Sequence, residues 1–166
     1  MKSIALIVFF LTSLSPPLQA ELGNLSSVAS TKYKYLGFIP LFEATYSTRL
    51  ENKNDDRLGE FSKSLKFVYK RKITKKQLIQ AADKILNKSY NQSELSTISK
   101  ELEAINALYE NVTVGDELKL FYQPDKGTTL FRNDKPLKTI AGSDFHKIYF
   151  SIWLGPDSPF SFEPID

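Results

Sequence analysis

The sequence has no cysteine and a single histidine, His146, among its 166 residues. Without thiols the chain can form no disulfide framework, perform no thiol catalysis and carry no lipid on an N-terminal cysteine. Zinc sites are built mainly from Cys and His, so we expect no metal, and no motif indicates another cofactor. The fold must therefore rest on a hydrophobic core, which a chain of this length can bury.

An excess of charge of one sign is also missing. The formal net charge is only +3, from 22 basic and 19 acidic residues. Proteins that bind nucleic acid concentrate basic residues in a patch or stripe, so we expect no nucleic-acid partner. The basic residues between Lys66 and Lys76 are expected to form a solvated face of a strand and a first helical turn.

Only one long hydrophobic run occurs, from Ile4 to Leu14, and Lys2 precedes it. It is shorter than the roughly 20 apolar residues that span a bilayer. A small residue, Ala20, follows where a signal peptidase cuts. We predict a signal peptide at residues 1–20 and one exported domain at 21–166 with no membrane span. Its expected location is the bacterial periplasm, or outside the cell otherwise.

Aromatic residues are plentiful, with 12 Phe and 8 Tyr, which favours a core rich in β-sheet. Pro40 interrupts one strand segment, so we expect a sheet edge or a bulge there. Residues 49–60 are charged and rich in Asn and Asp, as in an exposed loop. The expected strands are residues 25–29, 33–46 (a pair or one bent strand), 65–70, 118–122, 128–132 and 136–140.

Helices are indicated by capping boxes and by apolar residues at helical spacing. Thr74 with Gln77, and Asn91 with Glu94, have the spacing of a capping box at a helix start. A last helix is expected to begin with Ser143 as its cap, with His146 exposed beside the apolar stripe, and the tail after it looks irregular. Strands and helices thus come in runs, which predicts an α+β fold. Its antiparallel sheet would be packed on one face by a layer of helices.

Three stretches of the sequence, in order over about residues 28–155, resemble the chalcone isomerase-like family, in particular its exported bacterial branch. They are KYKYLGF at 32–38 followed by FEATY at 42–46; LKFVYKRKI at 65–73; and VGDEL at 114–118 with GTT at 127–129, Phe145 and IWLG at 152–155. The resemblance implies a large antiparallel sheet against a layer of helices, in agreement with the pattern.

The family includes true isomerases, which close a chalcone to a flavanone, and fatty-acid-binding relatives. The isomerases use an Arg and a Thr on neighbouring strands, and a Tyr and an Asn on the first helix after the central strands. In this sequence these positions fall near Lys32 or Lys34, Leu41, Leu78 and Ile85. Leu and Ile form no hydrogen bonds, so the resemblance implies that the donors stabilising an enolate are lost.

A cleft with apolar walls and polar groups at one end would suit an amphipathic ligand. A lysine would meet the acid head group, and a tyrosine hydroxyl would donate a hydrogen bond to it. The alternative is that both lysines point to water and both tyrosines are ordinary sheet aromatics. The candidate ligand-binding residues are Lys32, Lys34, Tyr46, Tyr69, Leu78 and Ile85.

These observations favour an exported, non-catalytic protein that binds a small apolar or fatty-acid-like ligand. Two alternatives remain open at this point. One is an isomerase or intramolecular lyase that acts on a substrate unlike chalcone. The other is an envelope interaction protein without a small ligand, whose partner surface is formed by the aromatics of residues 33–46.

Overall fold

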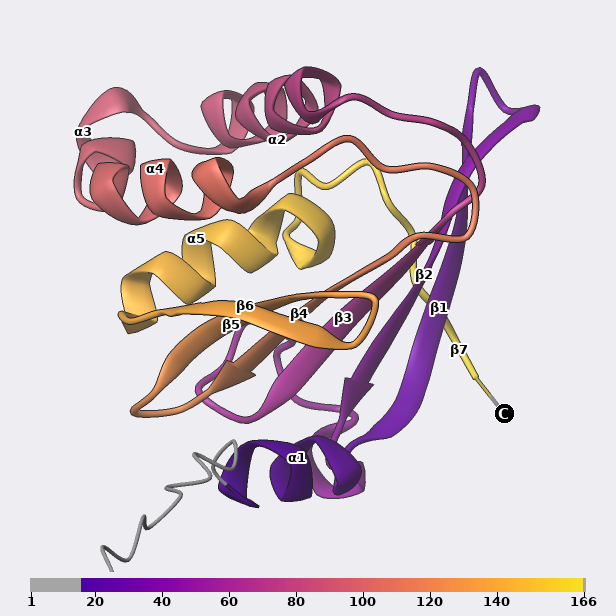
Figure 1. Ribbon diagram of the computed structural model, residues 1–166. Coiled ribbons are helices and arrows are strands. Elements are labelled where there is room, and N and C mark those ends of the chain that lie inside the picture. Colours follow the sequence, from indigo (N-terminus) through magenta and orange to yellow (C-terminus); the bar gives the residue numbers. More distant parts are fainter. Residues whose placement is uncertain (1–15, 166) are drawn as a thin grey trace, which may run out of the picture.

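The computed structural model describes residues 16–165, so the apolar run of the expected signal peptide lies outside the described part. That part contains a seven-stranded antiparallel sheet with the strand order β6-β5-β4-β3-β2-β1-β7 (Figure 1). The strands are β1 (Ser26–Tyr35), β2 (Ile39–Thr48), β3 (Lys63–Tyr69), β4 (Glu117–Gln123), β5 (Gly127–Arg132), β6 (Lys135–Ile140) and β7 (Glu163–Pro164). The predicted α+β class is confirmed.

The helices form a layer on one face of the sheet, except for α1, which lies on the other side (Figure 1). They are α1 (Pro16–Gly23), α2 (Lys75–Ser89), α3 (Gln92–Ser96), α4 (Ser99–Leu108) and α5 (Ser143–Leu154), with a 3-10 turn η1 at Leu50–Asn52. The sequence patterns did not predict α1. Within residues 16–165, no helix is long and apolar enough to cross a lipid bilayer.

The first hairpin contains the bulge expected at Pro40. Tyr33 pairs with Phe42, but the next residue, Lys34, pairs with Pro40, so Leu41 is the extra residue. The tail is not wholly irregular, because β7 pairs with β1 through Ala29 and Pro164. This pairing makes β7, rather than β1, the edge strand of the sheet.

Both predicted capping boxes are present. The Thr74 side chain accepts from the backbone N–H of Gln77, and Asn91 does the same for Glu94. The Ser143 cap was wrong: Gly142 takes the N-cap position with φ at 110°, and Ser143 is the first helical residue. Glycine tolerates this conformation, which lets the chain turn directly from β6 into α5.

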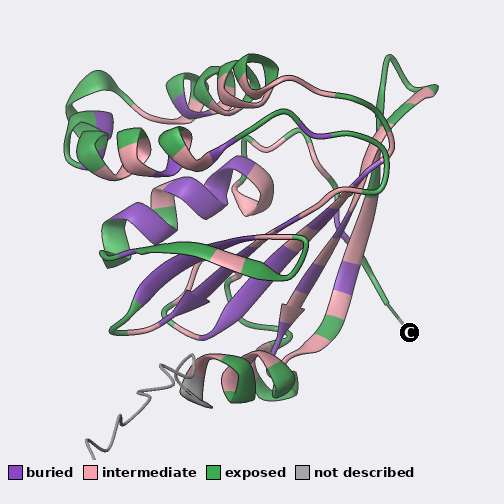
Figure 2. Ribbon diagram, viewed as in Figure 1, coloured by how far each residue is buried: buried purple, intermediate pink, exposed green. Residues whose placement is uncertain are grey.

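The core lies between the helix layer and one face of the sheet (Figure 2). Leu65, Phe67 and Tyr69 alternate along β3 as predicted, and all three are buried against the helices. The intervening residues point to the opposite face, which we call the open face; it carries Ser64 and Lys66. The open face is largely polar and is overlain in part by α1.

Candidate functional site

The structure places four of the six candidate residues on the helix side of the sheet. Tyr46 on β2 and Tyr69 on β3 are buried in the core cluster. Leu78 and Ile85 are half-buried on α2 and pack against the same cluster. These four side chains therefore share the layer between the sheet and α2.

The two candidate lysines lie on the other side. Lys32 and Lys34 are exposed on β1 and alternate with Tyr33, which stacks on Phe42 towards the helices. Because neighbouring strand residues point to opposite faces, both lysines project from the open face. The sheet thus separates the lysines from the tyrosines, and the six residues do not line one cavity.

Tyrosine hydroxyls meet beneath α2. The hydroxyls of Tyr109, just after α4, and Tyr149, on α5, lie 2.6 Å apart in the core. Burial raises the pKa of Tyr109 to about 12, and burial also raises the pKa of Tyr149 and of Tyr69. These phenols stay protonated at neutral pH, so they can donate hydrogen bonds but cannot act as bases.

A second buried polar cluster contradicts the expectation that His146 is exposed. His146 has no exposed surface and stacks on the ring of Tyr122, with the ring centroids 3.6 Å apart. The reason is that α5 is covered on two sides, since the sheet lies below it and α2 packs against it. A helix enclosed in this way buries two stripes, and His146 belongs to the second.

Lys63, at the start of β3, lies beside this histidine and is equally buried. Its ammonium donates to the carbonyl of Arg57 at 2.8 Å, to that of Gly59, and to Nε2 of His146 at 3.3 Å. The Nδ1 atom of His146 faces the carbonyl of Ser143 at 3.1 Å. A carbonyl can only accept, so Nδ1 carries the proton and Nε2 is the acceptor for Lys63.

Charges in this cluster shift each other's titration. Burial lowers the pKa of Lys63 to about 8, and burial together with the Lys63 charge lowers the pKa of His146 to about 4. Hydrogen bonds from Tyr122 and then Lys147 lower the pKa of Glu60 at the edge of the cluster. All three Lys63 donors are used within the protein, so this cluster holds residues 57–61 over the sheet and offers no free group to a substrate.

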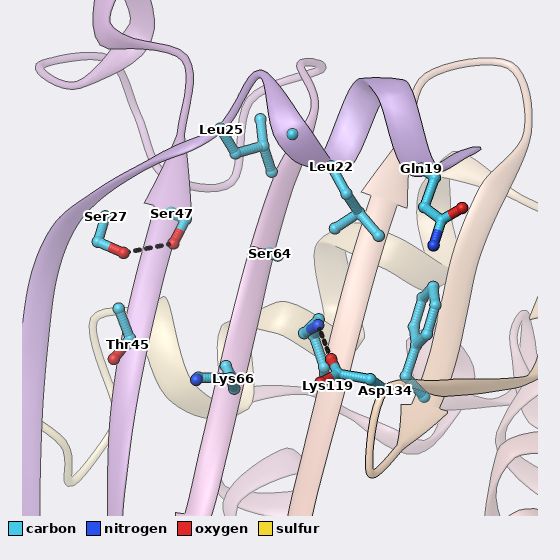
Figure 3. A pocket seen from close by; sticks show the side chains of 12 residues that line it. Gln19, Leu22, Leu25, Ser27, Thr45, Ser47, Ser64, Lys66, Lys119 and Asp134 are labelled. Atoms are coloured by element: carbon cyan, nitrogen blue, oxygen red, sulfur yellow. Dashed lines mark hydrogen bonds and ion pairs between the residues drawn. The ribbon is translucent and has the colours of Figure 1, made fainter. Parts of the chain in front are cut away.

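A hollow of about 510 Å³ lies between α1 and the open face. Its apolar wall comes from Leu22, Leu25 and Phe131, and its polar wall includes Lys66 and Lys119 (Figure 3). The carboxylate of Asp134 also lines the hollow, and hydroxyl groups are supplied by Ser27, Thr45, Ser47 and Ser64. The hollow therefore joins an apolar region to two cations and several hydrogen-bond donors.

The two cations stand side by side because Lys66 on β3 pairs directly with Lys119 on β4. Lys119 donates to Asp134 at 2.6 Å, which lowers the pKa of that carboxyl, and Lys66 lies 3.6 Å from a carboxylate oxygen of Glu117. The sequence analysis missed this site because it assigned Lys66 to a solvated face and predicted no α1. The sequence signal that could have located the site is the alternation along β3, which places Lys66 on the face opposite the buried Phe67.

Among residues 16–165, no three His, Cys, Asp or Glu side chains are grouped so that they could hold a metal ion.

Comparison with known proteins agrees with the fold. Among curated protein sequences, none matches this chain. The crystal structure of an Arabidopsis thaliana fatty-acid binding protein matches 81% of this chain, and the match covers 80% of that protein's chain. The TM-score is 0.60 and the sequence identity is 10%, so this match shows only that the two proteins share a fold. A family model described as chalcone isomerase-like matches residues 42–161, most of the sequence. The chain therefore belongs to the chalcone isomerase-like family.

Proposed function

We propose that the protein binds, without converting it, a small ligand with an apolar body and an acidic head, and that the site is the hollow beneath α1. One observation carries this proposal: the paired cations Lys66 and Lys119 adjoin the apolar side chains of Leu22, Leu25 and Phe131. A volume of about 510 Å³ is ordinary for a small-molecule site.

The lysines can change partners at low cost. Their present pairs, with Glu117 and Asp134, are partly exposed, and such surface pairs contribute about 0–1 kcal/mol each. A ligand carboxylate that enters the hollow would meet both ammonium groups at once, whereas Glu117 and Asp134 each pair with only one of them. Because one carboxylate would bond to two cations and the apolar body of the ligand would be buried as well, the exchange favours binding.

The fatty-acid binding described for the Arabidopsis thaliana protein supports the same class of ligand. At 10% identity the likeness does not locate the site, so the hollow itself is the evidence for where an acid would bind. A long-chain or medium-chain carboxylic acid is the simplest molecule that has both an apolar body and an acid head.

A role without catalysis is supported by the state of the groups best suited to move protons. Lys63 and His146 are buried on the helix side, and their donors and acceptors are occupied. The hollow lies on the opposite face of the sheet, so neither group can reach a ligand there.

Export of the chain forms part of the proposal. Glu21, which would become the first residue, bonds to Arg49 at 2.5 Å and to Ser62 at 2.9 Å. Cleavage after Ala20 would remove five of the eight residues of α1, so in the processed chain these Glu21 contacts are what would hold Leu22 and Leu25 over the sheet. Gln19 lines one end of the hollow, so its loss would widen the entrance.

Calorimetric titration of the 21–166 chain with dodecanoate and with dodecanol tests the proposal. We expect the double variant Lys66→Met/Lys119→Met to bind dodecanoate roughly tenfold or more weakly, while its affinity for dodecanol is unchanged. Lys72→Met/Lys76→Met, at exposed lysines elsewhere, is the matched control and should bind like the original chain. No binding of the acid, or equal binding by the double variant, would refute the proposal.

A further inference from the structure

The tip of the β1–β2 hairpin exposes three large apolar side chains within four residues. Tyr35, Leu36 and Phe38 are 53%, 67% and 70% exposed. The turn takes φ of 53° at Leu36 and 79° at Gly37, with weak backbone hydrogen bonds across it. A leucine seldom adopts this left-handed conformation.

This tip stands clear of the rest of the sheet (Figure 1). The pairing of β2 with β3 ends at Phe42 and Tyr69, so the hairpin continues beyond that point as a two-stranded ribbon. Figure 2 shows that the end of the ribbon is exposed. The apolar side chains are thus carried away from the body of the protein, where no other part of the described chain covers them.

Basic residues surround the base of the tip. Lys32 and Lys34 are exposed on β1, and Arg71 and Lys72 are exposed in the segment that follows β3. That segment is joined to the hairpin, because the backbone N–H of Lys70 donates to the carbonyl of Leu41 at 2.8 Å. Within residues 16–165, none of these four cations has a carboxylate oxygen within 4.0 Å.

We propose that the hairpin tip inserts into the interfacial region of an anionic lipid membrane. Leu36 and Phe38 would enter the acyl boundary, and Tyr35 would lie at the level of the head groups, where aromatic rings with a polar end collect. The cations at the base would then meet the anionic head groups.

A membrane fits the tip better than a protein partner does. A stable protein interface buries about 800 Å² on each side, whereas this apolar surface is confined to three side chains on a narrow ribbon. An apolar tip with a basic surround needs no matching groove, since lipid closes around it. This site is separate from the hollow beneath α1, so the inference does not depend on the proposed ligand.

Sedimentation of the 21–166 chain with phospholipid vesicles tests the inference. We expect binding to vesicles that contain phosphatidylglycerol, weak binding to pure phosphatidylcholine, and a decrease as salt is added. Leu36→Ser/Phe38→Ser should reduce binding at least about tenfold. Lys32→Gln/Lys34→Gln should reduce binding to anionic vesicles by about fivefold for each lysine.

Leu50→Ser is the matched control, because Leu50 is 64% exposed but lies outside the hairpin. It should bind vesicles normally, as should Lys66→Met/Lys119→Met, which separates this site from the hollow. The tip residues are exposed, so their variants should fold with an unchanged melting temperature. Absence of vesicle binding, equal loss in Leu50→Ser, or a tip that captures only a protein would overturn the inference.

Discussion

The ammonium of Lys63 lies 3.3 Å from Nε2 of His146, and neither side chain is exposed to solvent. Two basic groups thus share one enclosed position, with no carboxylate in direct contact with the lysine. The arrangement holds because His146 stays neutral and accepts, while Lys63 is charged and donates. Both the titration of His146 and the stability of the fold should report this pairing.

His146 is the only histidine, so its ring resonances can be followed by NMR without assignment. We expect it to titrate with a pKa of about 4, because burial and the nearby Lys63 charge oppose protonation. In Lys63→Met the value should rise towards the ordinary 6.5. A pKa near 6.5 in the unaltered chain would show that the His146 ring is exposed to solvent and does not pack between Tyr122 and Lys63.

Stability should depend on pH through the same histidine. In the unfolded chain His146 takes up a proton near pH 6.5, but in the folded chain only near pH 4. The unfolded state is therefore favoured as the pH falls from 6.5 to 4, by on the order of 3 kcal/mol. The free energy of unfolding of His146→Phe, measured with urea, should lack this dependence on pH. Identical pH profiles for the variant and the original chain would contradict the role of His146.

Removal of the Lys63 ammonium should destabilise the fold despite relieving a buried charge. In Lys63→Met the carbonyls of Arg57 and Gly59 and the ring of His146 lose their donor. We expect a net loss of about 2–4 kcal/mol in the free energy of unfolding. Lys66→Met, on the open face, should change it by less than about 0.5 kcal/mol. If Lys63→Met were more stable than the original chain, the cost of burying the Lys63 ammonium would exceed the stabilisation from its three hydrogen bonds.

The buried cluster shows where sequence patterns fail. Lys63 has the same parity along β3 as Leu65, so the alternation that buries Leu65 also buries Lys63. His146 is spaced from Tyr149, Phe150 and Trp153 as neighbours on one helix face are. These signals were present, but charge and polarity argued for exposure. The two side chains are buried because other elements cover α5 and because the loop before β3 lies over Lys63, and both are features of the tertiary structure.

Local chemistry made other features predictable. The capping boxes at Thr74 and Asn91 depend on a few adjacent residues and were predicted correctly. The hollow could not be predicted in the same way. It requires Leu22 and Leu25, which lie over the sheet where Glu21 contacts residues far along the chain.

Gly127, at the start of β5, should tolerate no side chain. Its φ is 109°, and an added Cβ would lie 2.1 Å from the carbonyl oxygen of Ile140. Gly127→Ala must therefore move the β5–β6 pairing, at a cost of about 3 kcal/mol or more. Gly115→Ala is the control, since Gly115 has φ of 87° but open space around it, and should cost about 1–2 kcal/mol. Equal melting temperatures for the two variants would contradict the geometry.

Processing of the leader can be measured directly by intact mass. In an exporting bacterial host we expect the purified chain to begin at Glu21. Ala20→Arg should block cleavage because the peptidase needs a small residue, and Ala20→Gly should permit it. Recovery of the unaltered chain with residues 1–20 attached would argue against export by this route.

The most direct measurement for the ligand site is an amide NMR titration of the 21–166 chain with dodecanoate. Binding in the hollow predicts that the amides of Leu22, Leu25, Lys66, Lys119 and Phe131 shift first and saturate together. In Lys66→Met/Lys119→Met the amides of Leu22, Leu25 and Phe131 should need roughly tenfold more dodecanoate to reach the same shift. Shifts centred instead on Tyr69, Leu78 and Ile85, or no saturable shifts at all, would contradict the site.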